Sequence, residues 1–328
     1  MKALRLPAFG APAQVPELVE VEPATPGPNQ VAVAIEAAPI NPSDLMLIAG
    51  DYGVRPQLPA ALGADGVGRI VAVGDGVDAS RIGERVMIVP TLEQGTWTDQ
   101  TVVDERNVVP VNPNADPLQL AMIGVNPVTA YVLLHDFAAL EPGAWVAQTG
   151  ASSAVGRYVI VLAKHAGVRT LNVVRRESAV QELLDAGAAA VVVSNEDFSE
   201  QVAGALGGAP LSLVLDGVGG EPVTTLAGQL KVGGAIVSYA ALGGKPIVVP
   251  PLTLIFRGLS VHGWWLKHWL DSTPPAKINE TYRELAALVA DGTLAAPVDA
   301  TYPLEEYRAA ITRAQASGRH GKVLFSLA

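Results

Sequence analysis

The sequence predicts an α/β protein in which a β-rich domain precedes a domain built on a doubly wound parallel sheet. In roughly the first 120 residues, short apolar runs are bounded by Gly, Pro, Asn and Asp, which is typical of strands joined by turns. From about residue 125, strand-like runs alternate with helical segments, which indicates βαβ units. Between the first such strand and helix lies QTGASSAVGR (148–157), a turn of small residues that allows close approach by a ligand.

The β-rich part, 1–122, contains three clear strand candidates, at 31–40, 68–74 and 84–89. Their spacing and their turn residues favour antiparallel or barrel-like packing. The stretch NPSDLMLIAGDYG (41–53) is typical of a turn followed by a polar loop tip. Several prolines between residues 110 and 117 then end the pattern.

The central part, 123–266, alternates strands with helices. Its strands are continuous apolar runs, as expected where helices cover both faces of a parallel sheet. The expected strands lie at 144–150, 170–174, 189–193, 211–216 and 234–240, and the expected helices at 154–167, 178–187, 196–206 and 219–231.

The C-terminal part, 267–328, no longer alternates in this way. Amphipathic helices are expected at 278–292 and 303–318, and each ends at a glycine. A strand is expected at 322–327. We expect this part to return to the first domain and complete it.

Composition excludes several classes of function. The 328 residues include 22 Lys and Arg against 32 Asp and Glu, a formal charge of −10. Without clustered cations, neither nucleic acid nor an anionic membrane is an expected partner, and no apolar run approaches the ~20 residues that span a bilayer. The chain has no cysteine, which excludes disulfides and thiolate zinc sites and fits a cytoplasmic protein.

The turn after the first strand of the central part is a candidate phosphate-binding turn. A dinucleotide fingerprint has three glycines here, for the turn, for approach to the pyrophosphate and for helix packing. This chain keeps only the last of these glycines. From the local sequence alone, a tight turn that binds no ligand is therefore an equally good interpretation. Small side chains still allow the approach, and the helix N-terminus favours an anion. The candidate residues are Ala151, Ser152, Ser153, Ala154, Val155 and Gly156.

Two arginines follow the next strand, about 20 residues beyond the turn. NAD-specific sites place an acidic residue there, whereas NADP sites place an arginine that pairs with the 2′-phosphate. Arg175 and Arg176 occupy this position, and a guanidinium binds phosphate through two hydrogen bonds. Because cations are unfavourable at the start of a helix, a ligand explains this pair better than a solvated helix start. The sequence therefore predicts NADPH as the cofactor.

The layout resembles the medium-chain dehydrogenase/reductase superfamily over essentially the whole chain. The resemblance implies a GroES-like catalytic domain, completed by the C-terminal part, around a Rossmann domain. Zinc-dependent members carry a cysteine near Ser43 and a histidine at the position of Ala64. Both ligands are missing and the five histidines form no cluster, so no metal is expected. Without a Lewis acid, the substrate must already be electrophilic, as a double bond conjugated to a carbonyl is.

Four strings narrow the resemblance: NPSDLMLIAGDYG, GVNPVTAYVLLHDF (124–137), LNVVRR (171–176) and GWWLKHW (263–269). They are similar to the zinc-free trans-2-enoyl-thioester reductases, which use NADPH. The resemblance implies that Tyr52 donates the proton, and a phenol is protonated at neutral pH, as a donor must be. The nicotinamide side maps to Asn126, Thr129, Trp264 and Trp265, and Tyr239 joins the candidate cofactor residues. The family usually dimerises through the edge around 258–263, so a homodimer is expected.

Other interpretations of these residues stay open. Asn41 is a candidate for orienting the substrate, although Asn41 and Asp44 are also typical of residues that order a turn. Asn126 precedes a proline and is suited to starting a helix. The tryptophans are more typical of a core or a dimer contact than of an acyl pocket. Two other functions remain, a quinone or enone reductase on the same scaffold and a non-catalytic NADPH-binding protein.

Overall fold

The computed structural model describes residues 1–327 and divides the chain into two compact units. Unit 1 is Met1–Val128 together with the segment from Thr273 onward, and unit 2 is Thr129–Ser272. The boundaries expected from the sequence were residues 122 and 266. The first boundary lies later because α3 (Asn126–His135) begins in unit 1, where Asn126 donates a hydrogen bond to Asn41. Within the described residues, no helix combines the length and the apolar character needed to cross a membrane.

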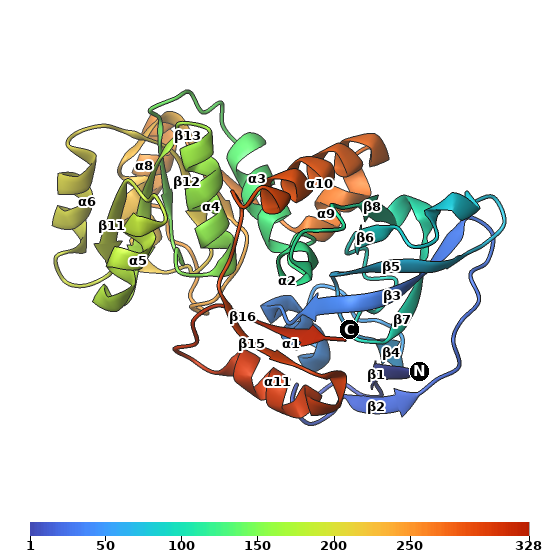
Figure 1. Ribbon diagram of the computed structural model, residues 1–328. Coiled ribbons are helices and arrows are strands. Elements are labelled where there is room, and N and C mark those ends of the chain that lie inside the picture. The colour runs from blue at the N-terminus through green and yellow to red at the C-terminus, as the bar shows by residue number, and fades with distance from the viewer. Residues whose placement is uncertain (328) are drawn as a thin grey trace. The chain divides into compact units, whose positions relative to one another are not determined.

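Unit 1 is β-rich, as the sequence predicts, and its sheets are mostly antiparallel (Figure 1). One sheet has the order β2-β1-β4, and the larger has the order β15-β16-β3-β5-β6-β8, with β7 also pairing with β3. Its strands are β1 (Lys2–Leu6), β2 (Glu17–Glu20), β3 (Gln30–Pro39), β4 (Ala60–Ala61), β5 (Gly66–Val73), β6 (Arg85–Ile88), β7 (Gln100–Asp104), β8 (Val108–Pro110), β15 (Val298–Tyr302) and β16 (Lys322–Ser326).

The pairing of β16 with β3 brings the C-terminal strand into the sheet of the first unit. Trp97 and Phe325 are buried there and meet edge to face at 5.2 Å between ring centroids. The helices of unit 1 are α1 (Pro42–Ala49), η1 (Ala79–Arg81), η2 (Glu105–Asn107), α2 (Pro117–Ala121), α10 (Pro275–Ala290), η4 (Leu304–Glu306) and α11 (Tyr307–Gln315).

One expectation for unit 1 was wrong. The Asn-Pro-Ser-Asp start was expected to be a turn, but residues 42–49 form helix α1. Residues 51–53, expected to be a loop tip, do lie outside helices and strands. Pro42 occupies the first helical turn, where its missing N–H costs nothing. The following Leu-Met-Leu-Ile-Ala run consists of adequate helix formers, and Gly50, at φ 82°, ends the helix in a left-handed conformation.

Unit 2 contains a six-stranded, fully parallel sheet of order β11-β10-β9-β12-β13-β14. This is the doubly wound order expected from the sequence. Strands β9 and β12 lie at its centre, and every residue of both is buried. The strands are β9 (Trp145–Gln148), β10 (Arg169–Val174), β11 (Ala190–Val193), β12 (Leu211–Asp216), β13 (Leu230–Ser238) and β14 (Ser260–Gly263).

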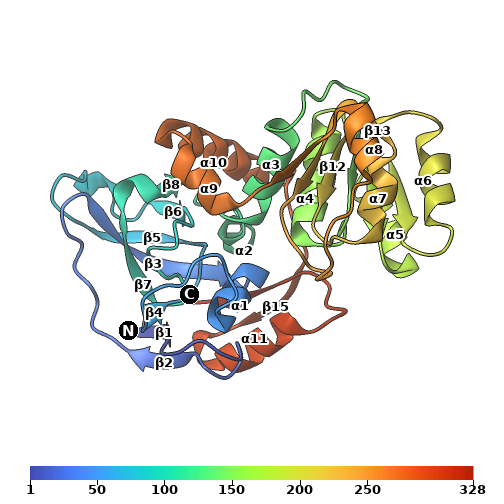
Figure 2. The ribbon, with the colours of Figure 1, turned by 180° about the vertical axis from the view of Figure 1, so that it is seen from behind.

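Helices cover both faces of this sheet. Figure 1 shows α4 and α5 in front of it, and Figure 2, seen from behind, shows α7 and α8 in front. The helix expected at 219–231 is shorter, because Gly228 ends α7 and β13 begins at Leu230. The helices are α4 (Ala154–His165), η3 (Glu177–Ala179), α5 (Val180–Asp185), α6 (Phe198–Leu206), α7 (Glu221–Ala227), α8 (Pro251–Arg257) and α9 (Leu266–Ser272).

Candidate active site and cofactor site

The predicted cofactor residues of unit 2 follow the carboxyl ends of its parallel strands. The turn at 151–156 follows β9, Arg175 follows β10, Tyr239 follows β13 and Trp264 follows β14. In a parallel sheet these ends lie along one edge, which is where ligands bind in doubly wound proteins. The fold therefore brings together residues that are more than 100 positions apart in the sequence.

The turn at 151–156 is built tightly. Ala151 is fully buried, Ser152 is exposed, and Ala154 and Val155 are partly exposed at the start of α4. Ser153 is the N-cap of α4, and its Oγ accepts a hydrogen bond of 3.1 Å from the backbone N–H of Gly156. Ser153, one of the residues that replace the glycines of the fingerprint, thus caps the helix that follows the turn.

Gly156 is needed for packing. A Cβ at this position would lie 2.5 Å from the carbonyl oxygen of Ala151, a backbone atom. We expect Gly156→Ala to lower the free energy of unfolding by about 1–3 kcal/mol, because the turn must shift to admit the methyl group. Thermal unfolding measures this loss. Gly204→Ala in α6 is the matched control, since nothing lies within 4 Å of its added Cβ. A Gly156→Ala protein as stable as the control would contradict the prediction.

Two buried amides that the sequence analysis did not single out hold this turn to the sheet. Gln148 Nε2 donates to the carbonyl of Gly156 at 2.8 Å and to Asn172 Oδ1 at 2.7 Å. Asn172 Nδ2 in turn donates to the carbonyl of Ala190 at 3.0 Å. Both side chains are fully buried. The signal was a polar amide in each of two mostly apolar strands, Gln148 at the end of β9 and Asn172 inside β10.

Tyr239 lies beside the same turn. Its backbone N–H donates to the carbonyl of Asp216, and its phenol is hydrogen-bonded to Ser153. Burial raises the pKa of the Tyr239 phenol, and the hydrogen bond to Ser153 offsets only part of that rise. The Asp216 carboxylate is fully buried and accepts from Thr149 Oγ1 at 2.6 Å and from the backbone N–H of Gly219 at 2.9 Å. The buried Asp216 carboxylate therefore holds the loop of residues 217–219 that follows β12.

Arg175 and Arg176 are both exposed directly after β10. Arg176 is the N-cap of η3, and its carbonyl accepts from the N–H of Ala179. Neither guanidinium lies within 4 Å of an acidic side chain among the described ion pairs. Two exposed cations at the edge of the sheet are therefore available to a phosphate.

Trp264 and Trp265 begin the segment after β14, and both are partly exposed. The N–H of Trp264 donates to the carbonyl of Ser238 at 2.9 Å, which fixes its backbone beside β13. Its indole Nε1 is buried and has no hydrogen-bond partner among the described residues. The ring of Trp265 meets His268 edge to face at 5.0 Å. Thr129, in α3, is 4% exposed and faces the interior.

Tyr52 lies just beyond α1 in unit 1 and is partly exposed. The carbonyl of Gly50 accepts two hydrogen bonds from the guanidinium of Arg55, at 3.0 and 2.8 Å. The N–H of Asp51 donates to the carbonyl of Met46 at 2.9 Å. The segment that carries Tyr52 is thus tied to the end of α1 on both sides of the tyrosine.

Asn41, at the other end of α1, is 1% exposed and bonded inside the protein. Its Nδ2 donates to Asp65 Oδ1 at 2.8 Å, and its Oδ1 accepts from Asn126 Nδ2 at 3.1 Å and from Lys322 Nζ at 2.5 Å. Its backbone N–H donates to Asp44 Oδ2 at 2.7 Å. The structure therefore gives the Asn41 amide protein partners, which favours an ordering role over a contact with substrate.

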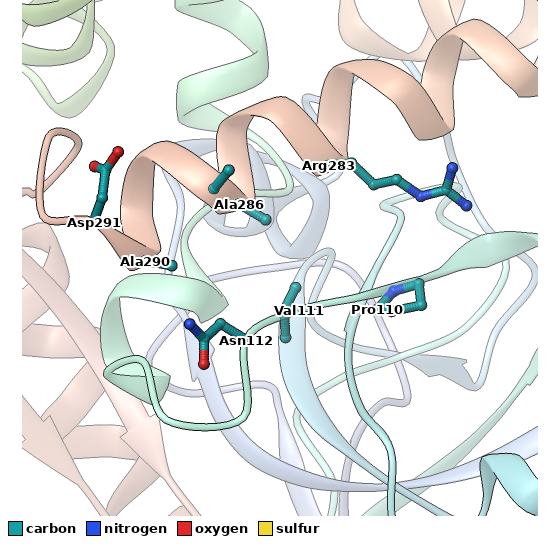
Figure 3. Close-up of a pocket in the computed structure, with 8 residues that line it drawn as sticks. Pro110, Val111, Asn112, Arg283, Ala286, Ala290 and Asp291 are labelled. Atoms are coloured by element: carbon teal, nitrogen blue, oxygen red, sulfur yellow. The ribbon is translucent and has the colours of Figure 1, made fainter.

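A separate hollow of about 540 Å³ lies between β8 and α10 (Figure 3). In the close-up, Arg283 and Asp291 lie toward opposite ends of the α10 segment, above the stretch from Pro110 to Asn112. It includes none of the residues predicted for the site.

Models of two protein families match the chain. The alcohol dehydrogenase GroES-like domain matches residues 27–113, and the zinc-binding dehydrogenase family matches 154–291. The mitochondrial enoyl-[acyl-carrier-protein] reductase of Bos taurus is 38% identical over 318 residues, which cover 95% of this chain and 84% of that protein. The chain belongs to the medium-chain dehydrogenase/reductase superfamily. Within that superfamily it is an enoyl-reductase homologue, an oxidoreductase acting on CH–CH groups.

Other relatives are similar to the chain in sequence or in fold. The Arabidopsis thaliana mitochondrial enoyl-[acyl-carrier-protein] reductase is 35% identical, covering 95% of this chain and 84% of its own. A putative NADPH:quinone reductase from Bacillus thuringiensis aligns with a TM-score of 0.90 at 30% identity over 99% of this chain and 98% of its own. The complex of Etr1p with NADP and crotonyl-CoA aligns with a TM-score of 0.85 at 25% identity over 99% of both chains.

These relatives correct one expectation and bear on another. The cytoplasmic location expected from the lack of cysteine is contradicted by the enoyl reductases, whose names place them in mitochondria. The name of the second family, zinc-binding dehydrogenase, raises the question whether this chain holds a catalytic zinc. Ala64 offers no ligand atom, Asp65 is engaged with Asn41 and with the N–H of Val125, and within residues 1–327 no three acidic or histidine side chains gather as ligands. These residues do not fit a catalytic zinc.

Proposed function

We propose that the protein reduces the carbon–carbon double bond of a trans-2-enoyl thioester with NADPH. The observation that carries this proposal is the identity of 38% to an enoyl-[acyl-carrier-protein] reductase over 95% of the chain. The relative that was solved with NADP and crotonyl-CoA supports the same cofactor and substrate class.

The residues present fit NADPH. The turn at 151–156 carries mostly small side chains, and Ser152 in it is exposed. Glycine at position 156 avoids the Cβ that would lie 2.5 Å from the carbonyl oxygen of Ala151. Arg175 and Arg176 would hold the 2′-phosphate. When bound, NADPH supplies the hydride that the β carbon of the double bond receives. Thr129, Trp264 and Trp265 are proposed to line the nicotinamide end.

Tyr52 completes the reaction. As hydride reaches the β carbon, negative charge collects on the thioester oxygen, and the α carbon then takes a proton. The phenol of Tyr52 gives up that proton and regains one from solvent, so each turnover consumes one NADPH and one proton. Asn41 and Asn126 hold the start of α1, and Arg55 holds the backbone beside Tyr52. The proposed reaction uses no metal ion.

A quinone or enone reductase is the second candidate function, favoured by the similarity to the Bacillus thuringiensis protein. Initial rates with NADPH separate the two when measured on crotonyl-CoA, a longer enoyl-CoA, a simple enone and 1,4-benzoquinone. The proposal predicts the highest kcat/KM for an enoyl-CoA. A higher kcat/KM for benzoquinone than for either thioester would overturn it in favour of the quinone reductase.

The proposed enzyme is a homodimer that joins through one edge of unit 2. Strand β14 is an edge strand of the parallel sheet, so the backbone N–H and C=O groups on its outer side have no neighbouring strand. Exposed apolar side chains occur in this strand and in α8, which precedes it along the chain: Val261 is 42%, Leu252 64%, Ile255 66% and Phe256 76% exposed. Large exposed apolar side chains of this kind are typical of a protein interface.

We expect light scattering to give twice the mass of the chain, and Phe256→Asp to give the monomer mass, because a buried unpaired charge opposes association. Ile82→Asp is the control, since Ile82 is an exposed apolar residue of unit 1. A wild-type monomer, or a dimer that survives Phe256→Asp as well as it survives the control, would contradict this interface.

A further inference from the structure

Lys322 is a buried lysine with specific partners. It is the first residue of β16 and is 4% exposed. Its ammonium donates to the carbonyl of Ile40 at 3.1 Å and to Asn41 Oδ1 at 2.5 Å. Lysine is almost never fully buried without compensation, because removing its charge from water is costly. Both acceptors belong to the junction between β3 and α1.

Two buried carboxylates supply the opposite charge around the same asparagine. Asp44 is 5% exposed and Asp65 is fully buried. Asp44 accepts from the backbone N–H of Asn41, and Asp65 accepts from its side-chain Nδ2 and from the N–H of Val125. Asn41 is therefore the hub through which one cation and two anions are connected.

Burial shifts the pKa of all three charged groups toward neutrality. Burial raises the pKa of Asp44 to about 6 and that of Asp65 to about 7, although Lys322 lowers both. Burial lowers the pKa of Lys322 to about 8, against the opposing pull of the two carboxylates, and the nearby Arg319 lowers it further. The Tyr282 hydroxyl donates to the carbonyl of Gly124 at 2.9 Å. Burial, and to a smaller extent the charge of Asp65, raises the pKa of the Tyr282 phenol.

The hub ties four segments of unit 1 together. Lys322 comes from β16, Asn41 begins α1, Asp65 precedes β5, and Asn126 begins α3. We propose that Lys322 is a positioning residue, which fixes Asn41 and thereby the orientation of α1 and of Tyr52 beyond its end. This rests on the proposed function, in which Tyr52 donates the proton.

Two neutral substitutions of similar size test the hydrogen bond apart from the charge. Lys322→Met has no donor, whereas Lys322→Gln keeps an N–H that reaches toward Asn41. We expect Lys322→Met to lower kcat on crotonyl-CoA about 100-fold with little change in the KM for NADPH, because small misplacements of a catalytic group are costly. Lys322→Gln is expected to recover about tenfold of that loss, the worth of one hydrogen bond. Lys277→Met, an exposed lysine of α10, is the control.

The pH profile and hydrogen exchange separate positioning from general stability. Lys322 lowers the pKa of Asp44 and Asp65, so removing its charge should raise the pKa of both carboxylates. If protonation of these carboxylates disturbs α1, the acidic limb of the kcat profile moves to higher pH. The shift should be equal in the Met and Gln variants, because both lack the charge. Amide exchange in residues 44–51 should be faster in Lys322→Met than in Lys322→Gln. Equal kcat for these two variants, or unchanged exchange in both, would overturn the proposal.

The outcomes also distinguish this proposal from the function on which it rests. If the wild-type protein leaves crotonyl-CoA unchanged, the proposed function fails, and exchange in residues 44–51 still decides whether Lys322 positions α1. If Lys322→Met does not fold, Lys322→Gln is compared with the wild type. A fall in kcat of about tenfold then supports the proposal, and full kcat contradicts it.

Discussion

Replacing Tyr52 with phenylalanine is expected to lower kcat for enoyl-thioester reduction by about 10²–10⁴-fold, the usual contribution of a positioned general acid. Only the hydroxyl is removed, and the aromatic ring is kept. The dissociation constant of NADPH should stay unchanged, because Tyr52 is not among the residues proposed to bind the cofactor. Steady-state rates with crotonyl-CoA and fluorescence titration with NADPH measure the two quantities.

Tyr302→Phe is the matched control, since it removes a phenol hydroxyl from β15 of the same unit. Its kcat should equal that of the wild type. If Tyr52→Phe also kept full kcat, the proton would have to come from another group or from water. If it lost NADPH affinity as much as kcat, Tyr52 would be a binding residue instead of a donor.

Replacing Arg175 and Arg176 together with glutamine is expected to raise the dissociation constant of NADPH about 10- to 100-fold and to leave that of NADH unchanged. Hydrogen bonds to charged groups contribute about 1.5–3 kcal/mol each, and NADH lacks the 2′-phosphate that would accept them. Each single variant should show part of the loss. The ratio of kcat/KM for the two cofactors measures this preference.

The control for the arginines is Arg106→Gln, which removes an exposed guanidinium from unit 1. It should leave both cofactors unaffected. Equal losses for NADPH and NADH in the double variant would show that the arginines support the fold of the edge and do not select the phosphate.

The architecture of unit 2 was predictable because its central strands are buried on both faces. That burial demands continuous apolar runs, and the runs that end at Val174 and Asp216 are the strands β10 and β12. The turn at 151–156 was also found, since its small residues stand between a strand and a helix. Its supports, Gln148 and Asn172, were missed because a buried polar residue looks like an interruption of the pattern.

The sequence was less informative about α1 and its surroundings. An eight-residue helix has little periodicity to detect, and the Asn-Pro-Ser-Asp start is as typical of a turn as of a helix N-terminus. The hub at Asn41 was not predictable at all. Lys322 meets Asn41 across 281 positions of sequence, and only the pairing of β16 with β3 brings them together.

The central claim is that hydride passes from NADPH to the β carbon of an enoyl thioester while the α carbon takes a proton that exchanges with solvent. Isotopic labelling of the product tests it most directly. With crotonyl-CoA and NADPH deuterated at the transferred position, we expect butyryl-CoA with one deuterium on the β carbon. With unlabelled NADPH in D₂O, the single deuterium should appear on the α carbon. Cofactor oxidation without a saturated thioester, or cofactor-derived deuterium on the α carbon, would contradict the account.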